Sequence, residues 1–128
     1  MWCQHPVYQR VAIRALNADI TFIGIGEVEL GGPLNAEGFI TDAQVQALKS
    51  QHVAGEMLGH FINHYGERLA SELDALLTSV PLTSHTGRQI IAFSGGARKY
   101  QAIRAALIGQ WITGLVTDED TALKLLKE

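Results

Sequence analysis

A glycine-rich turn followed by two basic residues is the clearest candidate for ligand chemistry in this sequence. Residues 94–99 (SGGARK) join an apolar run to a segment with helical spacing, and Gly95 and Gly96 form the turn. Such a turn directs backbone N–H groups and the positive end of a helix at one point, which favours an anion. Arg98 and Lys99 would lie in the first helical turn, where the helix dipole disfavours cations by about 0.3–1 kcal/mol. A bound phosphate or carboxylate contacted by Lys99 would offset that cost, whereas the alternative is a plain tight turn with solvated basic side chains.

Gly26 ends a second apolar run and is a second candidate for close approach of a ligand. The pattern Gly24-Ile25-Gly26 lacks the third glycine of the dinucleotide-binding fingerprint, because position 29 is Glu29. The Gly-Lys-Ser/Thr pattern that cradles nucleotide phosphates is also missing from the sequence. We therefore expect no cofactor, and Gly26 either admits a ligand to the backbone or forms an ordinary turn.

Three further sets of polar residues could bind a ligand or metal, but each could also serve only to cap a helix or form a turn. Residues 117–120 (TDED) could form an acid/base or metal cluster, but Thr and acidic residues also favour the start of any helix. His52, His60 and His64 are spaced eight and four residues apart, and a metal site would need His60 and His64 on one helix face. Residues 63–66 have the composition of a turn between two short strands, so we expect exposed histidines and no metal site. Asn63 could contact a ligand hydroxyl or serve only the turn.

Three short apolar runs are predicted as the strands that position these groups. They cover residues 20–25, 89–93 and 114–116, and their β-branched composition is typical of parallel strands covered on both faces. The predicted helices cover residues 7–16, 41–50, 97–108 and the segment after Thr117, with a short helix after Ser71. This order predicts an α/β fold with an open parallel sheet and flanking helices, Rossmann-like in arrangement. Because ligands bind at the carboxyl ends of parallel strands, the three candidate groups should meet at one edge of the sheet.

Capping residues and turn formers set the predicted boundaries. Thr41 and Gln44 are spaced as a capping box, and Thr117 is expected to cap the last helix with Asp120 in the reciprocal position. Residues rich in Gly and Pro mark the surface loops, which are predicted over 31–38 and 81–87.

Apolar residues exceed what so small a sheet can cover with its own helices. The residues expected to face the sheet from the helices are Ile103, Ala106, Leu107, Leu123, Leu125 and Leu126. The residues that supply surplus apolar surface are Val7, Val11, Phe22, Ile23, Leu115 and Val116. Uncovered strands and faces pair with another chain or aggregate, so we expect a homo-oligomer, in the first instance a two-fold dimer.

Composition bounds the classes of protein that the chain could represent. It has 128 residues, 47% of them hydrophobic and 18% charged, which suits one folded domain. The formal charge of −3 and the pI near 5.9 argue against direct contact with nucleic acid. No apolar stretch approaches the roughly 20 residues that span a bilayer, and the first residues lack the order of a signal peptide. With Cys3 as the only cysteine, we expect a cytoplasmic protein with no membrane contact.

Two long segments resemble the end of the sugar-binding domain of SorC/DeoR-type bacterial transcription regulators. In that family a G-G-x-x-K-x-x-A-I-x-A-A-L helix leads to a strand that ends in L-[VI]-T-D-E-x-T-A, and residues 95–107 and 115–122 follow both patterns in register. Upstream, residues 18–26 resemble the family's A-D-x-x-x-x-G-I-G strand, and residues 54–66 resemble its G-D-I … F-F-D-x-x-G stretch. The resemblance covers nearly the whole chain.

This resemblance implies a fold similar to ribose-5-phosphate and glucosamine-6-phosphate isomerases, used without catalysis to sense a phosphorylated sugar. It implies that Lys99 contacts the phosphate or polar end of the effector. By the same resemblance, Gly95 and Gly96 line the same pocket, and Gly26 and Asn63 complete the set of expected ligand-binding residues. The family commonly has Asp where Asn63 and Glu56 stand here.

The family's helix-turn-helix and the first half of its effector domain, with a threonine-bearing phosphate loop, have no counterpart in residues 1–128. We therefore expect a single, partial effector domain without a DNA-binding domain. The alternative is a sugar-phosphate isomerase-like enzyme that uses Glu27, Glu56 or Asp118 as general base.

Overall fold

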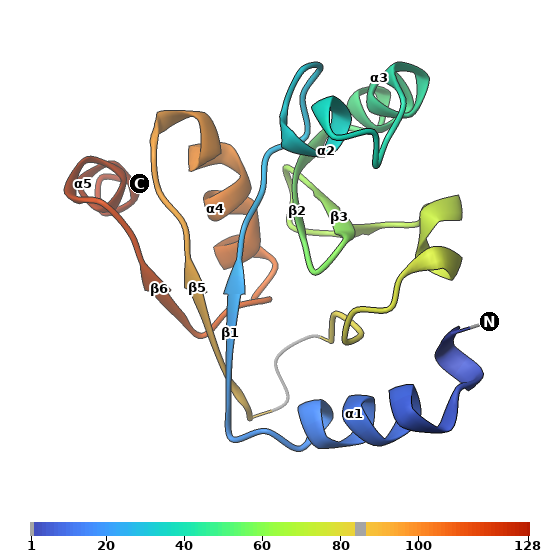
Figure 1. Cartoon of the computed structure of the whole chain (residues 1–128). Coiled ribbons are helices and arrows are strands. Elements are labelled where there is room, and N and C mark those ends of the chain that lie inside the picture. Colours follow the sequence, from blue (N-terminus) through green and yellow to red (C-terminus); the bar gives the residue numbers. More distant parts are fainter. Residues whose placement is uncertain (1, 84–86) are drawn as a thin grey trace.

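A computed structural model describes residues 2–83 and 87–128 of the chain (Figure 1). The strands in this part are β1 (Ile20–Gly24), β2 (Val53–Met57), β3 (His60–Asn63), β4 (Arg68–Leu69), β5 (Gln89–Phe93) and β6 (Gly114–Val116). The α-helices are α1 (Pro6–Leu16), α2 (Pro33–Ala36), α3 (Asp42–Ser50), α4 (Tyr100–Ile108) and α5 (Glu119–Leu125). The 3₁₀ helices are η1 (Trp2–Gln4), η2 (Glu72–Leu76) and η3 (Ala97–Lys99). The predicted loop over 81–87 lies partly outside the described residues.

The three predicted strands form one parallel sheet in the order β1-β5-β6. The prediction of an α/β fold with a parallel sheet and flanking helices is confirmed. The prediction that these strands are covered on both faces is wrong, because only one face packs against the core. Ile23 on that face is 5% exposed, whereas Phe22 and Phe93 on the other face are 63% and 53% exposed.

A second, antiparallel sheet in the order β2-β3-β4 lies beside the parallel one (Figure 1). The predicted turn over 63–66 is confirmed, because β3 ends at Asn63 and β4 begins at Arg68. The sequence did not predict β2, whose Gly55 interrupts the apolar pattern. A Cβ at Gly55 would lie 2.3 Å from the Cβ of Ala102, so glycine is what lets α4 approach this strand.

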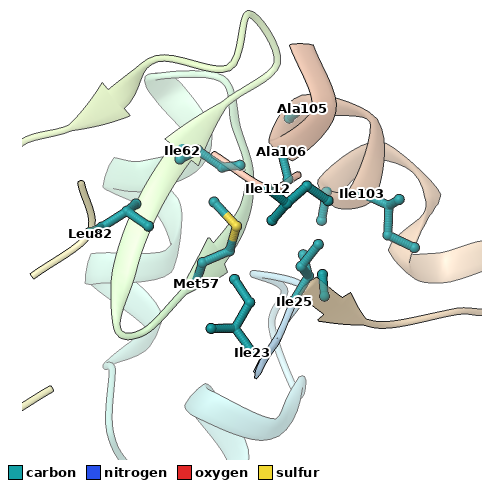
Figure 2. Packing of buried hydrophobic residues seen from close by; sticks show 11 residues of the cluster. Ile23, Ile25, Met57, Ile62, Leu82, Ile103, Ala105, Ala106 and Ile112 are labelled. Atoms are coloured by element: carbon teal, nitrogen blue, oxygen red, sulfur yellow. The ribbon is translucent and has the colours of Figure 1, made fainter. Parts of the chain in front are cut away.

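The main core lies where α4 meets both sheets (Figure 2). The buried side chains of this cluster are Ile23, Ile25, Met57, Ile62, Leu82, Ala92, Ala102, Ile103, Ala105, Ala106 and Ile112. A smaller cluster joins α3 to the β2-β3 hairpin through Val45, Leu48 and Phe61. The predicted capping box of α3 is confirmed, with the Gln44 N–H donating to Thr41 Oγ1 at 3.2 Å and the Thr41 N–H donating to Gln44 Oε1 at 2.8 Å.

Two helix boundaries differ from the predictions. The segment predicted as one helix over 97–108 begins with the 3₁₀ turn η3 and becomes α-helical only at Tyr100. Asp118, and not Thr117, is the N-cap of α5, because its carboxylate accepts a hydrogen bond from the Thr121 N–H at 2.8 Å. The predicted loop over 31–38 also contains the short helix α2.

The predicted apolar faces of α4 and α5 are only partly correct. Ile103 and Ala106 are buried, but Leu107 is exposed on the far side of α4. On α5, Leu125 packs against the core, whereas Leu123 is exposed and Leu126 is 83% exposed. The helix is only seven residues long, and its buried residue is Thr121. Among the described residues, no helix has the length and apolar character needed to cross a membrane.

Candidate functional site

The carboxyl ends of the parallel strands meet at one edge of the sheet, as the sequence predicted. The Ser94 hydroxyl donates to the Ile25 carbonyl at 3.0 Å, and the Ser94 N–H donates to the Val116 carbonyl at 3.1 Å. The segments that follow β1, β5 and β6 are therefore tied together within one residue of each strand end. This edge is the usual position of a ligand in an open α/β sheet.

An acidic side chain of the chain itself occupies the glycine turn at this edge. The Gly96 N–H donates to Asp118 Oδ2 at 2.7 Å, and a Cβ on Gly95 would lie 2.4 Å from the same oxygen. Gly96 has a φ of 95°, a conformation that L side chains rarely adopt. Hydrogen bonds from the Thr121 and Gly96 N–H groups lower the pKa of Asp118 to about 2. The anion that this turn was expected to attract is thus, at the Gly96 N–H, an ionised aspartate.

The two basic residues after the turn have different surroundings. Arg98 is exposed and forms an ion pair with Glu27, with Nη2 and Oε1 2.8 Å apart. A carboxylate of the chain therefore offsets the unfavourable position of Arg98, and no bound anion is required for it. Lys99 is half-buried and takes part in none of the ion pairs within the described residues, although its charge acts on Glu56. Lys99 is the cation that remains available to a ligand.

Glu56 is the functional candidate that the sequence interpretation left out of the predicted site. It lies on β2, which joins this edge through a bridge between Gly26 and Glu56, with backbone hydrogen bonds of 2.9 and 3.0 Å. Its Oε1 would lie 2.8 Å from a Cβ on Gly26, and its Oε2 accepts the Gly59 N–H at 2.9 Å. Burial raises the pKa of Glu56, and the Gly59 hydrogen bond and the Lys99 charge oppose that rise. The available signal was a single carboxylate in an otherwise uncharged strand, Val-Ala-Gly-Glu-Met.

Gly26, Gly95, Gly96 and Lys99 thus lie at or beside the strand-end edge, but Asn63 does not. Asn63 pairs with Val53, whereas Glu56 pairs with Phe61, so Asn63 lies at the opposite end of the hairpin, about 7 Å from Phe61 along β3 at 3.3–3.4 Å per residue. Its Oδ1 accepts the N–H groups of Tyr65 and Glu67 at 3.0 and 2.9 Å. In this structure Asn63 builds the turn.

The histidines follow the prediction only in part. His52 and His64 are exposed, but His60 is 6% exposed, with its Nδ1 3.3 Å from Asp74 Oδ1. The expectation that His60 is exposed is wrong because β3 is covered on both faces. Burial, followed by the nearby Arg68, lowers the pKa of His60, and Asp74 opposes that change. Across residues 2–83 and 87–128, no cluster of three or more metal-ligating side chains is present.

Thr117 contributes a further polar group to the edge. Its hydroxyl oxygen is buried and has no hydrogen-bond partner among the described residues. It would lie 3.3 Å from a Cβ on Gly95, so it is adjacent to the glycine turn. Lys99, Glu56 and this hydroxyl give the edge a cation, a partly buried carboxyl group and a donor or acceptor, which together suit a hydroxylated anionic ligand.

Comparisons with known proteins agree with this arrangement. The profile of the family described as "Putative sugar-binding domain" matches residues 1–127. The erythritol catabolism regulatory protein EryD of Brucella abortus (strain 2308) is 35% identical over 109 residues, which cover 85% of this chain and 34% of that protein. The sorbitol operon regulator of Klebsiella pneumoniae is 29% identical over 110 residues, covering 85% of this chain and 35% of the relative. The chain therefore spans about a third of the length of these curated relatives.

Solved structures show the same fold. The full-length sorbitol operon regulator SorC from Klebsiella pneumoniae superposes with a TM-score of 0.85 at 24% identity, over 96% of this chain and 41% of that chain. A DeoR family transcriptional regulator from Listeria monocytogenes gives a TM-score of 0.87 at 18% identity, over 96% of this chain and 50% of that chain. The chain belongs to the family of sugar-binding domains found in SorC/DeoR-type transcription regulators, and its length corresponds to part of such a domain.

Proposed function

We propose that the chain is the effector-sensing part of a transcription regulator of carbohydrate metabolism and that it binds a phosphorylated sugar without transforming it. The observation that carries this proposal is the meeting of Lys99, Glu56 and Gly26 at the carboxyl edge of the parallel strands. Lys99 would contact the phosphate or another anionic end, and Glu56 would accept hydrogen bonds from sugar hydroxyls. Gly26 leaves the backbone open to close approach. The names of the relatives, which refer to erythritol and to sorbitol, support a polyhydroxylated effector.

The location of the chain and its contact with nucleic acid are also part of the proposal. We place the chain in the cytoplasm, as one partial effector domain that makes no direct contact with nucleic acid. The pI near 5.9 supports the lack of contact with nucleic acid, because a DNA-binding surface needs an excess of basic residues.

Thermal unfolding with a panel of sugar phosphates tests the proposal. A ligand present at 100 times its dissociation constant should stabilise the chain by about 2.7 kcal/mol. The variant Lys99→Ala should lose the shift, whereas Lys127→Ala, which removes an exposed lysine beyond the end of α5, should retain it. A panel that leaves the unfolding temperature unchanged would argue against effector binding by this chain.

One observation favours a second candidate, an isomerase-like enzyme. A general base near neutral pH requires a carboxyl group with a raised pKa, and Glu56 has one beside Lys99. The other candidate bases fit less well, because Glu27 is paired with Arg98 and Asp118 has a pKa of about 2. Incubation with ribose 5-phosphate and glucosamine 6-phosphate decides the matter. Turnover that disappears in Glu56→Gln would favour the enzyme over the sensor.

We also propose that the chain forms a homo-oligomer, with a two-fold dimer as the simplest case. The uncovered face of the parallel sheet supports this, because Phe22, Phe93 and Val116 expose large apolar side chains on it. Val7 and Val11 of α1 are also exposed, and α1 has no buried residue. Sedimentation at micromolar concentration should give a mass above 13.9 kDa, and a stable monomer of that mass would contradict the proposal.

A further inference from the structure

A pocket of about 420 Å³ is lined in part by Glu56, whose carboxyl group also lies beside Gly26 at the strand-end edge. Apart from Glu56 its walls are apolar, and they include Phe39 after α2, Phe61 on β3, Leu73 and Leu76 of η2, and Leu77. Phe39 and Leu76 are exposed at its rim. The volume lies within the roughly 300–1,000 Å³ of small-molecule sites in proteins.

Polar contacts hold the walls of this pocket in place. Asp74 of η2 contacts His60 of β3 at 3.3 Å and Arg68 of β4 at 3.2 Å. On the other side of the same turn, Gln44 Nε2 of α3 donates to Glu72 Oε1 at 3.0 Å. The turn η2 is thus tied to the antiparallel sheet and to α3, so the pocket is part of the fixed structure.

Within residues 2–83 and 87–128, Glu56 is the only titratable side chain that lines the pocket. Its two carboxyl oxygens point to different surroundings: Oε1 faces Gly26 at the strand-end edge, and Oε2 faces the Gly59 N–H beside the pocket. One carboxyl group therefore borders both the polar edge and the apolar pocket.

The chemistry of the walls decides what could occupy the pocket. A sugar ring placed there would bury hydroxyl groups against Phe and Leu side chains, and burying a hydroxyl without a hydrogen-bond partner is unfavourable. An aliphatic or aromatic group has no hydrogen bonds to lose there, and its transfer from water into the pocket is favourable. A ligand with its anionic end at Lys99 and an apolar group beyond Glu56 would match both the polar strand-end edge and the apolar pocket.

We propose that the effector is a phosphorylated glycoside with an apolar substituent, and that this substituent occupies the pocket formed by Phe39, Phe61, Leu73, Leu76 and Leu77. The inference rests on the proposed function, because it assigns the phosphate to the strand-end edge. It adds the class of effector, an aryl or alkyl glycoside phosphate in place of a simple sugar phosphate.

The test compares calorimetric titrations of the whole chain with 4-nitrophenyl glucoside 6-phosphate and glucose 6-phosphate. Burial of about 100 Å² of apolar surface at roughly 25 cal/mol per Å² favours the aryl compound by at least about tenfold in dissociation constant. Leu76→Ser and Phe39→Ser should bring the ratio of the two constants toward one. Leu126→Ser removes an exposed leucine just after α5 and should leave that ratio unchanged.

The outcomes separate this inference from the proposed function. Equal binding of the two phosphates would overturn the inference and leave the sugar-phosphate sensor in place. Binding of neither would overturn both. A preference for the aryl compound that survives both rim substitutions would also overturn the inference, because the substituent would then lie outside this pocket.

Discussion

At the scale of single residues, Asp118 accepts the hydrogen bond from the Gly96 N–H that the sequence assigned to a bound anion. The φ of 95° at Gly96 directs its N–H at the Asp118 carboxylate, which also caps α5. One side chain therefore serves the turn after β5 and the helix after β6. Their relative position is fixed by the β5-β6 pairing and not by local sequence, so the sequence showed both motifs without their contact.

Gly96→Ala should destabilise the chain, because an L side chain at positive φ costs roughly 1–2 kcal/mol. Gly24→Ala is the matched control, since a Cβ at Gly24 meets no atom within 4 Å and its φ is not positive. The free energies of unfolding of both variants can be measured in urea. Equal stabilities of the two variants would contradict the role assigned to the Gly96 backbone.

The lowered pKa of Asp118 predicts a specific dependence of stability on pH. A carboxyl group with a pKa of about 2 when folded and about 3.8 when unfolded stabilises the fold above pH 3.8, and this contribution is lost as the pH falls toward 2. Asp118→Asn should therefore lose less stability than the unsubstituted chain between pH 5 and pH 2. Asp120→Asn, on the same helix, is the control and should follow the unsubstituted chain. Parallel curves for all three proteins would show that Asp118 is not held as described.

At the scale of elements, the position of the site depends on how closely α4 lies against β2. Gly55 permits that approach, because a Cβ there would lie 2.3 Å from Ala102 Cβ and 2.6 Å from the Gly26 carbonyl oxygen. This packing holds Glu56 beside Gly26, at the edge where η3 places Lys99. The packing of one helix thus determines whether the two charged groups of the site meet.

Gly55→Ala should destabilise the chain by about 1–3 kcal/mol, because the added methyl group meets backbone atoms that cannot move aside. Adding Ala102→Gly removes one of the two clashes, so the double variant should recover part of the loss despite the cost of a glycine within α4. Chemical denaturation of the two single variants and the double variant measures this coupling. Additive losses would show that Gly55 and Ala102 do not pack together.

The parallel strands could be predicted from sequence because each is a short run of apolar, often β-branched residues between turn formers. β2 could not, since its Gly55 is required by a helix about 45 residues later in the chain, which no local pattern reveals. For the same reason Lys99 was predicted as a binding residue, whereas Glu56 was named only as a possible general base of the alternative enzyme. A local motif marks Lys99, whereas the role of Glu56 depends on its bridge to Gly26.

At the scale of the whole molecule, the parallel sheet has one covered and one uncovered face. The rings of Phe22 and Phe93 contact each other edge to face on the uncovered side, with centroids 5.7 Å apart. Both lie near the strand ends that carry the candidate site, so a partner on this face would lie close to the effector. Assembly and effector binding could then be linked through the turns after β1 and β5.

Phe22→Thr should weaken self-association while leaving the fold intact. Thr suits a β-strand, and an exposed side chain contributes little to folding, so the free energy of unfolding of the monomer should change by less than about 0.5 kcal/mol. A buried aromatic residue at the centre of an interface contributes about 2 kcal/mol or more to the free energy of association. In a two-fold dimer the substitution removes this residue from both subunits. We therefore expect the dimer dissociation constant from sedimentation equilibrium to rise at least about tenfold. Phe39→Thr makes the same change at another exposed phenylalanine, away from this sheet, and should leave the constant unchanged. If Phe22→Thr and Phe39→Thr weaken association equally, the uncovered face of the parallel sheet is not the surface through which the chains meet.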